Sequence, residues 1–175
     1  MGIQQINASY VAEEDRLLLR VTTSQAQEYR LWLTRAVAAK FLDVSDKAVV
    51  SALAKQHPEE QAKAIAEFQE EVLAEKETFT QPFKPVEDLP LGESPLLVVG
   101  IKATVEGAVC HLGLQLANRH TLTLHLGNDL LLRTKLLLKK IVAKAQWFNP
   151  SGLISTQEVE PMPLKAAPNT DKIFH

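Results

Sequence analysis

Alternation of apolar and polar side chains, which is typical of strands with one buried face, marks two neighbouring segments early in the chain. The segment RLLLRVTT at 16–23 places leucine or valine at positions 17, 19 and 21. The segment EYRLWLT at 28–34 places tyrosine or leucine at 29, 31 and 33. The four polar residues between them, 24–27, predict a hairpin. A weaker alternation over 3–11 predicts a further strand before both.

After Thr34 the period changes. The segment 35–56 is rich in Ala, Lys, Leu and Val and holds neither glycine nor proline, so it predicts a helix. Pro58, followed by Glu59 and Glu60, predicts the start of a second helix that runs to Lys76 and lies on the surface. The segment 78–95 contains four prolines and no sustained periodicity, which indicates a linker.

The same pattern returns in the second half. Segments 96–105, 109–116 and 121–126 predict three strands, and 128 to about 146 predicts a helix that Gly127 or Asn128 caps. The tail 148–175 has four prolines and little periodicity, and we expect it to be extended or disordered.

A shift of 93 positions lays the first half on the second with the apolar positions of all three strands in phase. Because a slip of one residue would turn the apolar set to the wrong face, the shared phase favours a duplicated unit of three strands and a helix. Coincidence between two ordinary meanders is the alternative. Such units are small, so the two are expected to pack together about a pseudo-twofold axis.

The predicted fold is therefore α+β with two βββα repeats. The first repeat is 1–56, the connecting helix and proline-rich linker are 57–95, the second repeat is 96–147 and the tail is 148–175. Together they are expected to form one compact domain.

Composition limits the classes of function. The chain has 175 residues and a formal net charge of −2, which argues against a wholly basic nucleic-acid-binding surface but allows a local basic patch. The start lacks the basic and apolar regions of a signal peptide, and no apolar run reaches the ~18 residues of a membrane span, so we expect a cytoplasmic protein. We expect no cofactor. The single cysteine, Cys110, falls on the inward phase of its strand and is interpreted as a small buried hydrophobe.

His111 and His125 are the candidates for metal chemistry. If residues 117–119 form the hairpin loop, these two histidines face each other on the outer side of the sheet. Such a pair suits a metal ion or a pH-sensitive contact, and ordinary surface histidines are the alternative. No third ligand is visible, so no metal site is predicted.

Two further surfaces could bind a partner. The outer face of the first hairpin carries cations and an aromatic ring, a combination that suits single-stranded nucleic acid or a protein partner; its residues are Arg16, Leu18, Arg20, Arg30 and Trp32. Alternatively, Trp32 and Leu18 pack under a helix or against another subunit. In the last helix, Leu132 and Leu136 stand among polar positions, which predicts an oligomer interface and a homodimer as the default. The other possibility is that the helix 58–76 folds back over these leucines.

The stretches EEDRLLLRV and EYRLWLTR, within 5–41, resemble an uncharacterised proteobacterial protein family of unknown function. This resemblance implies no activity and no functional residues. The duplicated sheet-plus-helix outline is similar to the Pur-alpha and whirly single-stranded nucleic-acid binders, although those have four strands per unit and this chain shows three.

The first functional hypothesis is a non-enzymatic protein-interaction or regulatory protein of the bacterial cytosol. A single-stranded nucleic-acid binder is the first alternative. A small-molecule binder or enzyme with a cleft between the repeats is the second, although no catalytic motif supports it.

Overall fold

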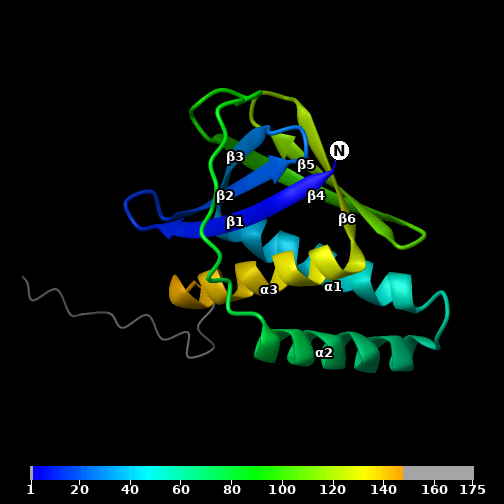
Figure 1. Cartoon of the computed structure of the whole chain (residues 1–175). Coiled ribbons are helices and arrows are strands. Elements are labelled where there is room, and N and C mark those ends of the chain that lie inside the picture. Colours follow the sequence, from blue (N-terminus) through cyan, green and yellow to red (C-terminus); the bar gives the residue numbers. More distant parts are fainter. Residues whose placement is uncertain (1, 148–175) are drawn as a thin grey trace, which may run out of the picture.

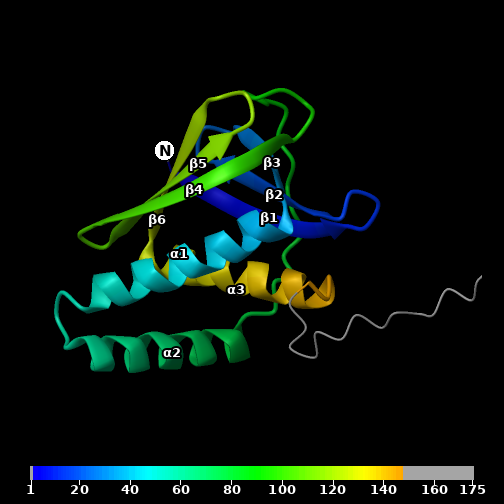
Figure 2. The same cartoon turned by 180° about the vertical axis from the view of Figure 1, so that it is seen from behind.

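The computed structural model describes residues 2–147, and the predicted tail 148–175 lies outside the described residues. The described chain is α+β and has three layers: a six-stranded sheet, the helices α1 and α3 beneath it, and α2 beneath them (Figures 1 and 2). The elements are β1 (Ile3–Val11), β2 (Arg16–Thr23), β3 (Glu28–Leu33), α1 (Arg35–Leu53), α2 (Glu59–Lys76), β4 (Leu96–Glu106), β5 (Val109–Leu116), β6 (Thr121–Gly127) and α3 (Asn128–Lys144).

The strand order is β1-β2-β3-β4-β5-β6. Each half is an antiparallel meander, as predicted, but the two meanders form one continuous mixed sheet. Their junction is a short parallel pairing in which Leu31 lies opposite Leu96 and Trp32 opposite Leu97. The edge strands β1 and β6 also approach one another, so the sheet is strongly curved.

The strand phases follow the sequence pattern. Leu17, Leu19 and Leu31 on the first meander, and Leu112 and Leu124 on the second, are at most 1% exposed on the inner face. These side chains pack against helix residues that include Phe41, Leu131 and Leu138 in one hydrophobic core. The exceptions are β1, where the pairing with β2 shifts between Ile3 and Gln5, and β4, where the pairing with β5 shifts between Val98 and Gly100. The irregularity in β4 leaves Val98 buried and Val99 57% exposed.

The helices α1 and α3 each pack mainly against a strand of the other half. α1 follows β3 in sequence but lies mainly against β4 and α3, and α3 follows β6 but lies mainly against α1 and β1. α1 begins where the Thr34 side chain accepts a hydrogen bond from the Val37 N–H at 3.3 Å, a typical N-cap. It ends at Leu53, earlier than the predicted Gln56.

α2 forms the outermost layer and buries only Ala62 and Ala66. It is held by ion pairs in which Glu70 contacts both Lys135 and Lys139 of α3. Burial alone would lower the pKa of Lys135, but hydrogen bonds with Asp46 and Glu70 outweigh it and hold that pKa above its ordinary value. Lysine side chains are ordinarily solvated, whereas the structure buries Lys135.

The leucines proposed as an oligomer interface are covered within the chain. Leu132 is 7% exposed and Leu136 is 5% exposed, and α2 packs on this side of the α1–α3 layer. Of the two possibilities that the sequence leaves open, the structure shows the one in which the helix at 58–76 folds back over these leucines. In the described part of the chain, no helix combines the length and apolar character needed to cross a membrane.

Candidate interaction surface on the outer sheet face

The outer face of the sheet gathers the residues that the sequence singled out. Leu18 pairs with Trp32 and Arg20 with Arg30 across β2 and β3, so these side chains share one face, and each is partly exposed. The helices α1 and α3 pack on the opposite face (Figures 1 and 2). The alternative in which Trp32 and Leu18 pack under a helix is therefore wrong.

A segment of the chain itself crosses one end of this face. Residues 78–94, which we call the strap, run from α2 across β1 and β2 towards the start of β4 (Figure 1). The strap reaches β3 through a parallel bridge between Gln27 and Asp88, and the Glu28 N–H donates to the Asp88 carbonyl at 2.9 Å. The sequence predicted a linker here but gave no indication of where it lies.

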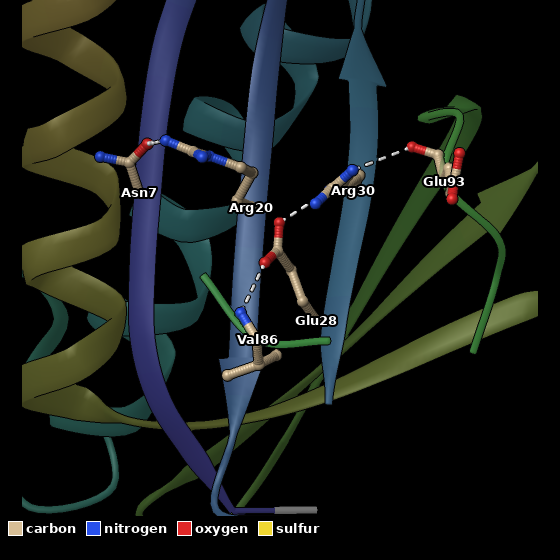
Figure 3. Close-up of polar contacts among 6 residues, drawn as sticks. All are labelled: Asn7, Arg20, Glu28, Arg30, Val86 and Glu93. Carbon is tan, nitrogen blue, oxygen red and sulfur yellow. Dashed lines mark hydrogen bonds and ion pairs between the residues drawn. The ribbon is translucent and has the colours of Figure 1, made fainter. Parts of the chain in front are cut away.

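Side chains of the sheet hold the strap by its main chain. The Gln5 carboxamide donates to the Pro82 carbonyl and accepts from the Lys84 N–H, both at 3.1 Å. The Val86 N–H donates to Glu28 at 3.3 Å, and Arg30 donates to the Glu93 carbonyl at 3.2 Å (Figure 3). These contacts address groups that every extended peptide presents, so they bind a chain conformation rather than particular side chains.

Glu28 is the polar residue that sequence reasoning missed. Its side chain is fully buried, and it accepts hydrogen bonds from Arg30 Nε at 2.8 Å and from the Val86 N–H. The corresponding position of the second meander, Thr121, is exposed, as is its cross-strand partner Gln115. The strap therefore accounts for the burial of Glu28, because an outward-facing carboxylate would otherwise be solvated.

The arginines of the face have partners within the chain. Arg20 Nη2 donates to Asn7 Oδ1 at 2.9 Å, and its guanidinium lies 3.9 Å from the centroid of the Phe83 ring (Figure 3 shows the Asn7 contact). Arg20 Nε is buried and makes no hydrogen bond within the described residues. Arg16 pairs with Glu14 at 3.5 Å. Arg16 and Arg30 are therefore paired with carboxylates, whereas Arg20 contacts a neutral amide and a neutral ring.

Next to the strap the outer face is apolar. Leu18 faces Trp32, Trp32 faces Leu97 across the parallel junction, and Val99 follows on β4. We call Leu18, Trp32, Leu97 and Val99 the apolar floor. Within the described residues, Val99 and Phe68 are the exposed large hydrophobic side chains. Phe68 lies elsewhere, on α2, at an open groove of about 450 Å³ between the helices.

The predicted histidine pair is present on the outer face of the second meander. His111 and His125 are register partners, and their ring centroids lie 4.7 Å apart in an edge-on arrangement. Glu106 Oε2 is 3.6 Å from His111 Nε2. Within residues 2–147, no group of three His, Cys, Asp or Glu side chains is arranged to hold a metal ion.

Cys110 is 1% exposed, and burial raises the pKa of its thiol, so its predicted inward orientation is confirmed. A thiol in this setting stays protonated and packs as an apolar side chain.

Comparisons of the chain with protein-family models, with curated proteins and with solved structures found no match.

Proposed function

We propose that this chain is a non-enzymatic protein-interaction or regulatory protein of the bacterial cytosol that binds a partner protein on the outer face of its sheet. The carrying observation is that this face already binds an extended segment by its main chain and continues into an open apolar floor. A partly exposed tryptophan such as Trp32, with aliphatic neighbours, is typical of the centre of a protein interface.

The same geometry gives less support to the nucleic-acid alternative. Arg30 is paired with the buried Glu28, and Arg20 is stacked on Phe83, so the cations that would neutralise phosphates are already engaged. Binding of a single strand should weaken steeply as salt is added. An oligonucleotide titration at low salt, with Trp32→Ala as the stacking variant, tests this alternative directly.

We propose further that the two meanders with their helices are structural repeats. Three element starts support this: Arg16, Glu28 and Arg35 lie 93 positions before the starts of β5, β6 and α3.

The loops 24–27 and 117–120 give a second line of support. Ala26 and Arg119 occupy the same loop position, and both have positive φ, at 56° and 70°. The β1 register adds a correction to the gap-free alignment. Ala8 lies opposite Leu19 and Ala103 lies opposite Leu112, so the first strands correspond at an offset of 95. A shorter β4–β5 hairpin accounts for the two residues, and the even shift preserves the phase.

A homodimer is the partner that the sequence first suggested. With Leu132 and Leu136 buried, we propose that such a dimer forms through the apolar floor, and light scattering should then give twice the 19.4 kDa of one chain. The variant Val99→Glu should return such a dimer to the monomer mass.

The test of the proposed function compares the outer face of the sheet with the surface around Phe68 on α2. A photo-crosslinking residue at position 32 should capture a partner in the source cells that the same residue at position 68 does not. The partner is then identified, purified and titrated by calorimetry against three chains, which are the unchanged chain, Val99→Glu and Phe68→Glu.

Val99→Glu should weaken binding by at least about tenfold, because it places a charge in an apolar contact, and Phe68→Glu should bind like the unchanged chain. Equal losses, or a loss confined to Phe68→Glu, would exclude the outer face as the binding surface. The absence of any reproducible position-32 crosslink would overturn the proposed function itself.

A further inference from the structure

We infer that the partner docks as an extended peptide segment, read through its main chain, with an aromatic side chain stacked on Arg20, and that the strap occupies this site as an intramolecular ligand. This inference rests on the proposed function and specifies the class of partner and the way in which access to the site is controlled.

The geometry of the Gln5 clamp defines the backbone that fits. Its carboxamide binds the carbonyl of residue 82 and the N–H of residue 84, two groups that point the same way only when the chain between them is extended. The buried Glu28 then takes the N–H of residue 86, again two positions on. A helical or tightly turned segment cannot present these groups together.

The strap also shows which side chains the site accepts. Prolines stand at 82 and 85, where the sheet requires no N–H, and their fixed φ holds the segment extended before it binds. Phe83 lies over the guanidinium of Arg20, whose buried Nε has no hydrogen-bond partner within the described residues. An aromatic ring at this position stabilises the cation that it covers. The preferred partner is therefore a proline-containing extended segment with an aromatic residue after the first proline.

The strap is bound in a way that permits exchange. None of the residues 78–94 is buried, and contact is confined to partly exposed side chains and the main-chain hydrogen bonds. Because α2 and β4 tether its two ends, the strap competes at an effective concentration of about millimolar. A partner that stops at the strap site binds weakly against this competitor. A partner that continues past Arg30 onto Trp32 and Val99 gains the apolar floor, which the strap leaves open.

The experiment measures whether the strap sequence binds in trans. A fluorescent peptide of residues 79–93, FTQPFKPVEDLPLGE, is titrated by anisotropy into the full chain and into its Phe83→Ala variant. The variant, whose own strap is weakened, should bind the peptide at least about tenfold more tightly than the unchanged chain. A scrambled peptide should bind neither. Equal binding of the two peptides, or equal binding by the two chains, overturns the inference.

A double-mutant cycle separates recognition from a general effect on folding. Replacing Phe83 in the peptide should weaken binding to the Phe83→Ala chain, and this penalty should vanish when the chain also carries Arg20→Met. Gln5→Leu should weaken the binding of both peptides alike, because Gln5 contacts only the main chain of the bound segment. An undiminished penalty in the Arg20→Met chain contradicts the stacking assignment.

If Phe83→Ala prevents folding, the unchanged chain provides the test. Excess peptide should speed hydrogen exchange at the Val86 amide of the strap, which otherwise donates to the buried Glu28 carboxylate, and should leave the Leu19 amide unaffected. No change at Val86 overturns the inference. The proposed function stands apart from this result, because a partner can still bind the apolar floor in a Val99-dependent way while the strap stays closed.

Discussion

The buried carboxylate of Glu28 offers a quantitative test of the strap. Replacing it by glutamine keeps the shape of the side chain but substitutes an NH2 group for one acceptor oxygen. In the unchanged chain, the Glu28 carboxylate accepts hydrogen bonds from Arg30 Nε at 2.8 Å and from the Val86 N–H at 3.3 Å. A carboxamide has one acceptor oxygen, so in either orientation one of these donors meets another donor.

The expected cost follows from those two contacts. A buried donor left without an acceptor costs about 1–3 kcal/mol, and more when it is charged, so Glu28→Gln should lower the free energy of unfolding by about 2 kcal/mol. Glu28→Leu leaves both donors without a partner, and because Arg30 is charged the loss should approach ~4 kcal/mol. Thr121, the exposed position that corresponds to Glu28 on β6, supplies the control. Thr121→Gln should change stability by less than about 0.5 kcal/mol.

Urea unfolding followed by circular dichroism measures these differences as shifts in midpoint at constant slope. If Glu28→Gln proves as mild as Thr121→Gln, the carboxylate is hydrated in solution and the strap does not cover the face. That result would refute both the burial argument and the assignment of the strap as an intramolecular ligand.

Three further predictions concern the rest of the molecule. Lys135→Met should change the free energy of unfolding by less than about 1 kcal/mol, because the aliphatic stem is kept. Glu70→Gln should lower the free energy of unfolding by ~1–3 kcal/mol, because it removes a carboxylate partner from the buried ammonium of Lys135. Denaturant melts of the two variants decide the order. The hydrogen bond from Trp147 Nε1, at 2.8 Å, is the main cause that lowers the pKa of Asp15. Stability from this contact is therefore present above the unfolded pKa of about 4 and is lost as pH falls through the folded pKa. Trp147 fluorescence should change over that acid range and stay constant from about pH 5 to 8. Ala26→Gly should raise the unfolding free energy by roughly 0.5–1 kcal/mol, because an L side chain at φ 56° is strained, and an unchanged thermal midpoint would contradict this.

Much of the fold can be predicted from the sequence because strand and helix phases are local properties. The alternation around Leu19 and Leu112 identifies the inner face correctly, and the histidine pairing follows from loop length alone. The bulge at Val99 could not be predicted, because consecutive apolar residues at 96–99 leave the phase undetermined.

The strap is the larger omission. It is held through carbonyl and N–H groups, which are the same for nearly every residue, so no side-chain pattern marks its binding site. Glu28 was hidden for the same reason, since an outward-facing carboxylate on a strand is ordinarily solvated. The burial of Lys135 could not be predicted, because the sequence leaves open whether α2 returns over it.

The crossed packing of the helices has a consequence for synthesis on the ribosome. α1 rests mainly against β4, a strand that lies more than forty residues later in the chain. Phe41 and Val49, which end up buried, therefore leave the exit tunnel before the surface that covers them has been translated. At typical elongation rates this interval lasts several seconds. The first half of the chain therefore emerges as an incomplete module, and a messenger truncated before β4 would yield a product that exposes its apolar helix face to chaperones and proteases.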